Sequence, residues 1–75
     1  MPDDELDEER IRTESVARGL VGLDEAAATT AAEAAGCSTR VGIRDGNPYV
    51  VTMDYRPSRI TFAIESGQVV AADVG

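Results

Sequence analysis

The stretch that decides the fold reads Val50-Val51-Thr52-Met53-Asp54-Tyr55-Arg56-Pro57-Ser58-Arg59. It begins as a β-branched run, which favours extended backbone, and ends as a polar segment in which Pro57 fixes one dihedral angle. Residues 60–64, Ile-Thr-Phe-Ala-Ile, then alternate apolar with small or polar side chains, as a half-buried strand does. The sequence therefore predicts a long, exposed and stiff loop that leads into a strand. A loop of this length in so small a domain is more often functional or disordered than filler.

Further strands are indicated on both sides of this unit. Residues 39–44 alternate well enough for a strand, and residues 45–48, Asp-Gly-Asn-Pro, form a turn cluster. Residues 65–68 are a hairpin turn signal, and residues 69–74 give the last strand. The two strands that flank the loop can pair in parallel, with the last strand closing the sheet as an antiparallel hairpin.

One helix is predicted over residues 24–35. Asp24 is well placed as its N-cap, alanine dominates its length, and Gly36 supplies a left-handed stop. Cys37, the single cysteine, is interpreted as a small buried hydrophobe rather than a reactive thiol. These elements predict an α+β fold, a single helix packed on a small mixed β-sheet with a protruding loop.

The domain is near the lower size limit for folding without help, because a chain this short buries only about 60% of its unfolded surface. Its core therefore has to be small. The predicted core consists of Val21, Leu23, Ala31, Val41, Ile43, Ile60, Phe62, Ile64 and Val70.

The acidity of the chain is concentrated at its start. Residues 1–15 carry seven acidic side chains against two arginines, a net charge of −5, whereas the remaining residues carry seven against five, a net charge of −2. We expect residues 1–17 to be an acidic, flexible leader, a solvated tail or frayed helix, and residues 18–75 to be the folded domain. A docking tail for a basic partner is the alternative interpretation of the leader.

Composition narrows the function classes. The chain has no histidine and one cysteine, so nucleophilic triads and four-ligand zinc sites lack their residue types. An enzyme is disfavoured, although catalysis by carboxylates alone stays open, and no cofactor or metal is expected. No basic stripe exists to neutralise phosphates, which disfavours nucleic acid, and no apolar run is long enough to cross a membrane. Without a recognisable signal peptide the chain is expected to be cytoplasmic, with secretion open if the sequence has been trimmed.

The loop carries an arrangement that suggests a purpose. In an extended segment Thr52 and Asp54 point away from Met53, and their oxygens can accept hydrogen bonds from Arg56 or from Arg59 at the base of the next strand. The result would be a convex backbone braced from beneath, with Met53 projecting outward, a shape that a protease active site accepts. The alternative is a surface loop with an incidental ion pair, which contributes little.

At this point the residues resemble a known family. Residues 51–56, then Arg59-Ile60 and the closing Val74-Gly75, are similar to the potato inhibitor I family, which includes the barley chymotrypsin inhibitor and eglin. The run Thr-Met-Asp-Tyr-Arg-Pro-x-Arg resembles still more closely a related family of bacterial and fungal peptidase inhibitors that includes a fungal elastase inhibitor. Leu20-Val21-Gly22 matches the motif before the helix in both, so the resemblance covers about residues 20–75.

The resemblance implies a monomeric, reversible, substrate-like inhibitor of subtilisin-like, chymotrypsin-like or elastase-like serine proteases. Its reactive-site bond would be Met53–Asp54, with Met53 in the primary specificity pocket. The protease-binding loop would comprise Val50, Val51, Thr52, Met53, Asp54, Tyr55 and Arg56. Thr52 and Asp54 would be held by arginine, and Arg56 and Arg59 are the candidate tethers.

Two departures from the family pattern are visible. The plant and leech inhibitors have a second arginine two residues after the first, where this chain has Thr61. Members of the bacterial and fungal family often pair two cysteines, one of them near the final glycine, where this chain has Val74 and leaves Cys37 alone. A thinner tether and modest stability are expected from these differences. The alternative function is a non-inhibitory protein-interaction module on the same scaffold.

Overall fold

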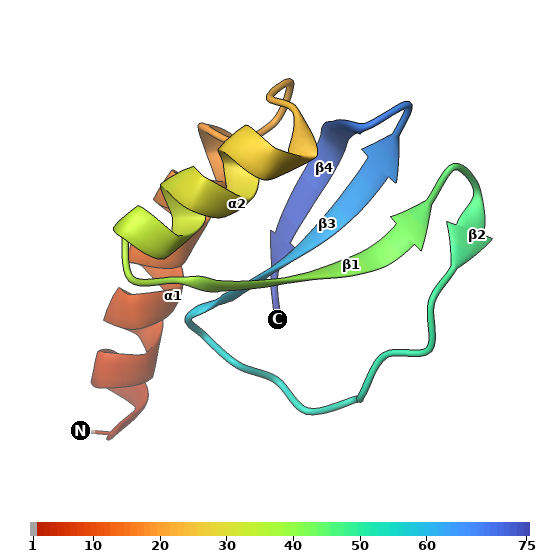
Figure 1. Ribbon diagram of the computed structural model, residues 1–75. Coiled ribbons are helices and arrows are strands. Elements are labelled where there is room, and N and C mark those ends of the chain that lie inside the picture. The colour runs from red at the N-terminus through yellow and green to blue at the C-terminus, as the bar shows by residue number, and fades with distance from the viewer. Residues whose placement is uncertain (1) are drawn as a thin grey trace.

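The computed structural model describes residues 2–75, with side chains from residue 8 onward. Two helices and a four-stranded mixed sheet make a small α+β domain, in which the strands lie side by side in the order β2-β1-β3-β4. Figure 1 shows both helices on one side of the sheet and the long loop bowing out on the other. The elements in chain order are α1 (Pro2–Arg18), α2 (Glu25–Ala34), β1 (Ser38–Arg44), β2 (Asn47–Pro48), β3 (Arg59–Glu65) and β4 (Gln68–Val74).

The helix predicted from the alanine-rich segment is α2. The Asp24 side chain accepts a hydrogen bond from the backbone N–H of Ala27 at 2.8 Å, which satisfies one of the free donors of the first turn. At the other end Gly36 adopts a φ of 82°, the left-handed conformation that favours glycine. Ala28 and Ala32, one turn apart, are fully buried, and their methyl groups let the helix lie close to the sheet.

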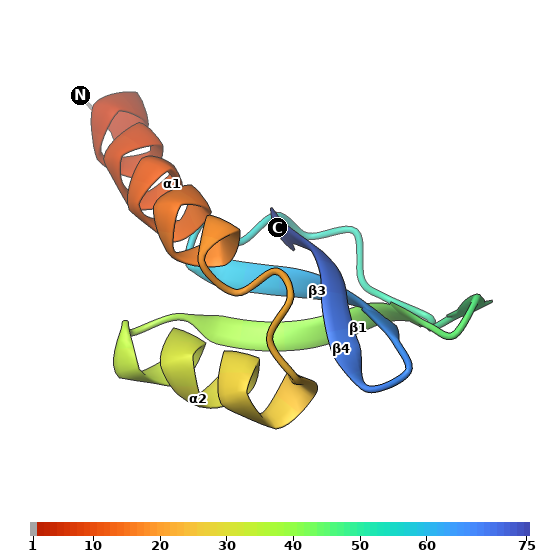
Figure 2. The same ribbon diagram turned by 90° about the horizontal axis from the view of Figure 1, so that it is seen from above.

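The expectation of a single helix on the sheet is wrong, because residues 2–18 form the second helix, α1. The solvated-tail interpretation does not hold for residues 8–18, where Thr13 and Ala17 are 1% and 3% exposed. The Thr13 hydroxyl donates to the carbonyl of Glu9 at 2.9 Å, so its burial leaves no orphaned donor. Figure 2 shows this helix running past the end of the sheet. The buried face of the described part of α1 is narrow, because it consists of two small residues four apart with Val16 packed beside them, and the surrounding charges conceal it.

The predicted pairing of the strands is confirmed. Strand β1 runs parallel to β3, with Arg40 opposite Thr61, and β3 runs antiparallel to β4. The short strand β2 and β1 are joined by a two-residue turn at Asp45 and Gly46, both with positive φ. The Asp45 carboxylate accepts from the backbone N–H of Ser66 at 2.8 Å, which fastens this turn to the turn between β3 and β4.

The core lies between the two helices and one face of the sheet. Ile60, Phe62 and Ile64 are buried as predicted, and Val41 packs against them. The other buried apolar residues, which the predicted core omitted, are Ala17, Leu20, Ala28, Ala32, Cys37 and Val69. The burial of Cys37 agrees with its interpretation as a small hydrophobe.

Five residues of the predicted core are exposed instead: Val21, Leu23, Ala31, Ile43 and Val70. Two β-bulges explain the errors in the strands. The pairing skips one residue between Val41 and Ile43, and it skips Val70 between Val69 and Ala71. An extra residue reverses the alternation of side chains, so Val69 rather than Val70 faces the core. In α2, the inward stripe consists of Ala28 and Ala32, which leaves Ala31 on the outer face.

Candidate functional site: the long loop

The long loop, residues 49–58, joins β2 to β3 and presents apolar side chains to solvent. Residues 49–56 are all exposed, and Val50 and Met53 are as accessible as in an extended chain, at 104% and 97%. The large apolar side chains exposed on this loop are Tyr49, Val50, Val51, Met53 and Tyr55. A gathering of exposed apolar residues on a monomer typically marks a surface that contacts another molecule.

Arg59, the first residue of β3, holds the C-terminal side of the Met53–Asp54 bond. Its Nη2 donates to the main-chain oxygen of Asp54 at 2.9 Å, and its Nη1 lies 3.6 Å from the Asp54 carboxylate. Its Nε donates at 2.9 Å to the main-chain oxygen of Gly75, whose N–H in turn donates to the Arg59 carbonyl. Only 12% of the Arg59 side chain is exposed, so its guanidinium is held against the end of the sheet where β3 begins. The predicted tether by Arg59 therefore has a direct geometric basis.

Arg56 contacts the same carboxylate from within the loop. Its Nε donates to Oδ2 of Asp54 at 2.9 Å, and 66% of its side chain is exposed. This contact links two residues within the loop but does not connect the loop to the sheet. An exposed pair of this kind contributes little to folding stability, so Arg56 is the weaker of the two predicted tethers.

The Asp54 carboxylate is held in its ionised form. The Thr52 hydroxyl, then the Arg56 guanidinium and the charge of Arg59, lower the pKa of the Asp54 carboxyl below its usual range. The Thr52 hydroxyl and the Asp54 carboxylate thus interact with each other, a contact that was not predicted from the sequence.

A third arginine contacts the loop, and sequence reasoning missed it. Arg40, in the middle of β1, donates from Nη1 to the main-chain oxygen of Thr52 at 3.2 Å and to the Thr52 hydroxyl at 3.3 Å. Its Nε donates to the Thr61 hydroxyl at 2.9 Å. The predicted parallel pairing of the strands could have pointed to Arg40. The register that sets Arg40 opposite Thr61, however, cannot be deduced from the sequence of either strand alone.

The N-terminal end of the loop is fastened to both the sheet and α2. The Tyr49 N–H donates to the Gly42 carbonyl at 2.9 Å, and Arg44 Nε donates to the Tyr49 hydroxyl at 2.7 Å. Arg44 also forms a two-pronged ion pair with Glu25 of α2, with Nη2 to Oε2 at 2.8 Å. Hydrogen bonding to Arg44 lowers the pKa of Glu25, and the reciprocal bond raises the pKa of Arg44. Both ends of the loop are thus fixed to regular structure.

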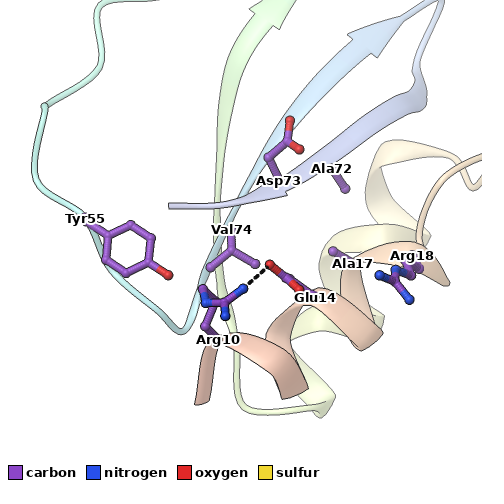
Figure 3. A pocket seen from close by; sticks show the side chains of 8 residues that line it. All are labelled: Arg10, Glu14, Ala17, Arg18, Tyr55, Ala72, Asp73 and Val74. Atoms are coloured by element: carbon purple, nitrogen blue, oxygen red, sulfur yellow. Dashed lines mark hydrogen bonds and ion pairs between the residues drawn. The ribbon is translucent and has the colours of Figure 1, made fainter. Parts of the chain in front are cut away.

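An open cavity of about 370 Å³ lies beside the C-terminal part of the loop, between Tyr55 and helix α1. Figure 3 shows the Tyr55 ring facing Arg10 and Val74 across this cavity, with the Arg10–Glu14 ion pair on the helix side. The lining is mixed in charge and open to solvent, and it contains no nucleophile beside a base. Within the described part of the chain, no group of three or more metal-ligating side chains is placed to hold an ion.

The structure therefore brings together four of the predicted site residues, Thr52, Asp54, Arg56 and Arg59, and adds Arg40 to them.

None of the described helices is both long and apolar enough to cross a membrane. Comparisons with protein-family models, with curated proteins and with solved structures find no match to this chain.

Proposed function

We propose that this protein is a reversible, substrate-like inhibitor of serine proteases, with Met53–Asp54 as its reactive-site bond. One observation carries the proposal: Met53 is almost wholly exposed, while the residues on either side of it are each held to the sheet by an arginine. A surface loop without a binding role has no need for such bracing. The motif Thr-Met-Asp-Tyr-Arg-Pro-x-Arg supports the same function by resemblance.

Tight binding would come from a loop that is ordered before it meets the protease. A flexible peptide loses conformational freedom when it enters an active site, whereas residues 52–54 are already fixed by hydrogen bonds to the sheet. The loss on binding is correspondingly small. Protease–inhibitor interfaces of ordinary size, roughly 1,600 Å² in total, are among the tightest known.

Met53 determines the class of protease in this proposal. Its side chain is unbranched, apolar and flexible, so it suits an apolar primary pocket and not one that ends in a carboxylate. Subtilisin-like, chymotrypsin-like and elastase-like enzymes are therefore the expected targets. A pocket built for lysine or arginine would leave its own buried charge without a partner.

Slow cleavage follows from the same bracing. When the protease serine oxygen bonds to the Met53 carbonyl carbon, the bond to the Asp54 nitrogen breaks and the nitrogen leaves as an amine with a proton from the protease. Arg59 holds the Asp54 main-chain oxygen at 2.9 Å, so this amine stays beside the ester. It can attack the ester again and re-form the peptide bond before water does.

The proposal is tested by tight-binding titration against subtilisin, chymotrypsin and pancreatic elastase, with mass spectrometry of the inhibitor after long incubation. We expect stoichiometric inhibition and a slow single cut between Met53 and Asp54. Met53→Asp should abolish inhibition, and Val21→Asp, at an exposed apolar position outside the loop, should not. Rapid degradation, or no effect on any of the three enzymes, would instead favour a non-inhibitory interaction module.

A further inference from the structure

We propose that Arg40 is a positioning residue for the reactive bond, holding the N-terminal side of Met53–Asp54 from a different strand than the one that holds the C-terminal side. This inference rests on the proposed function. Arg40 lies on β1 and bonds Thr52, whereas Arg59 lies on β3 and bonds Asp54. The two halves of the bond are therefore anchored independently.

The Arg40 guanidinium connects three parts of the chain at once. Its Nη1 donates to both oxygens of Thr52, at 3.2 and 3.3 Å, and its Nε donates to the Thr61 hydroxyl at 2.9 Å. The planar fork of arginine makes such a bridge possible, because donors at different nitrogens point to different acceptors. Lysine, with one nitrogen, cannot reproduce it.

Thr61 relays the anchor to Gly75, the residue that follows β4. Its hydroxyl accepts from Arg40 and donates its own proton to the main-chain oxygen of Gly75 at 2.9 Å. The same Gly75 oxygen accepts from Arg59 Nε at 2.9 Å. Both anchors thus converge on one acceptor, the Gly75 oxygen. In this set of hydrogen bonds, the two guanidinium groups donate, and the Thr61 hydroxyl accepts one bond and donates one.

Gly42, the residue at the bulge in β1, makes room for this arrangement because it has no side chain. A side chain at Gly42 would place its Cβ only 2.9 Å from the Thr61 methyl group, closer than such atoms approach in proteins. The glycine therefore lets Thr61 keep the orientation in which its hydroxyl faces Arg40. Thr61, which by sequence alone suggested a thinner tether, instead is the relay for an arginine on the neighbouring strand.

The consequence for inhibition concerns the acyl half of the cleavage site. After the protease has formed its ester with Met53, Arg40 keeps Thr52 in place, just as Arg59 keeps Asp54 in place. Loss of Arg40 frees the residue that precedes the ester, so the ester drifts away from the waiting amine. We expect Arg40→Ala to lower affinity for subtilisin about tenfold to a hundredfold and to accelerate net cleavage.

The test combines inhibition with a measurement on the free protein. Backbone amide order parameters of residues 50–54, measured by NMR on the full chain, should fall in Arg40→Ala at Thr52 and Met53, with the amides of β4 unchanged. Arg12→Ala removes the same charge from an exposed position on α1 and should leave both order and affinity as in the wild type. The exchanged pair Arg40→Thr with Thr61→Arg should restore order at Thr52, because the two positions face each other in the register.

The outcomes separate this proposal from the proposed function. Wild-type order at Thr52 in Arg40→Ala overturns the positioning role, whether or not the protein inhibits a protease. Affinity that falls only in proportion to a lower free energy of unfolding, with the loop still ordered, overturns it as well. If the wild type inhibits nothing but Thr52 loosens in Arg40→Ala, the arginine holds the loop and the proposed function alone has failed.

Discussion

The two faces of the sheet are built from alternate residues of the same strand, yet they do different things. On the side that faces the helices, Ile60, Phe62 and Ile64 of β3 are at most 1% exposed and form the centre of the core. On the other side, Arg59 of the same strand donates to Asp54 of the loop, and the Thr61 hydroxyl accepts from Arg40, which in turn donates to Thr52 of the loop. One face stabilises the domain, and the other orders the long loop, whose residues take no part in the core.

The difference teaches that stability and loop order depend on different forces here. Burial of apolar surface is strong and has no direction, so it fixes the strands without specifying where a loop lies. Hydrogen bonds to a charged guanidinium are directional and set the position of individual atoms. Substitutions on the two faces should therefore give effects that can be measured separately.

The largest expected effect is loss of the fold on the helix-facing side. Phe62→Ala removes the largest fully buried side chain and should cost about 3–5 kcal/mol of unfolding free energy. A chain of this size has only about 4–11 kcal/mol in total, so the variant should be partly unfolded at room temperature. Urea denaturation followed by circular dichroism gives the value. Val70→Ala, on an exposed bulge residue, is the control and should stay within about 0.5 kcal/mol of the wild type.

The next effect is on the loop-facing side. Arg59→Ala removes two hydrogen bonds to main-chain oxygens and should cost about 1.5–3 kcal/mol of unfolding free energy, less than the core substitution. Its main functional effect should be on the cleavage rate: the variant should be cut between Met53 and Asp54 at least tenfold faster than the wild type. Time courses with subtilisin, resolved by mass spectrometry, measure this. An unchanged cleavage rate in a folded variant would show that Arg59 does not brace the loop.

A third substitution should change target choice and leave stability alone. Met53 is 97% exposed, so Met53→Lys should alter the free energy of unfolding by no more than about 0.5 kcal/mol. Inhibition should move from subtilisin-like to trypsin-like proteases, because the lysine then meets the carboxylate of a trypsin-like pocket. Inhibition constants against both enzymes decide the matter. Binding that ignores residue 53 would contradict Met53 as the residue in the primary pocket.

The smallest expected effect is a pH dependence confined to acid. The Thr52 hydroxyl, then Arg56 and Arg59, lower the pKa of the Asp54 carboxyl in the folded protein. Its contribution to folding stability is therefore fully present at pH values above the ordinary aspartate pKa of about 3.9. It is lost as the pH falls through the lower folded value. Loop order and inhibition should be flat from pH 8 to about 5, and order in the folded protein should decline only at pH values well below about 4. NMR titration of the Asp54 side chain, with Asp54→Asn as the control, reports this directly.

Much of the fold could be predicted because local signals agree with it. The alternation in residues 60–64, the Asp24 cap and the two turn clusters each specify their element within a few residues, and the strand pairing follows from their order. The loop residues around Met53 could also be predicted to project or brace, since extended backbone alternates.

What escaped prediction depends on contacts between distant segments. Helix α1 is concealed by its charges, because in its described part Thr13 and Ala17 are buried, with Val16 packed against the core, among charged neighbours. The choice of Val69 over Val70 depends on a bulge, and the role of Arg40 depends on the register of two parallel strands. The last two depend on a one-residue shift in strand pairing, which propensity and pattern do not resolve.

The anchors of the loop include the main-chain oxygens of Thr52 and Asp54, and every amino acid possesses such oxygens. The side chains of Val50 and Met53 are exposed and take no part in these anchoring hydrogen bonds. Mutation can therefore exchange the outward side chains while the loop keeps its path. Under the proposed function, substitutions at these exposed positions would adapt the domain to a changed protease without altering its scaffold.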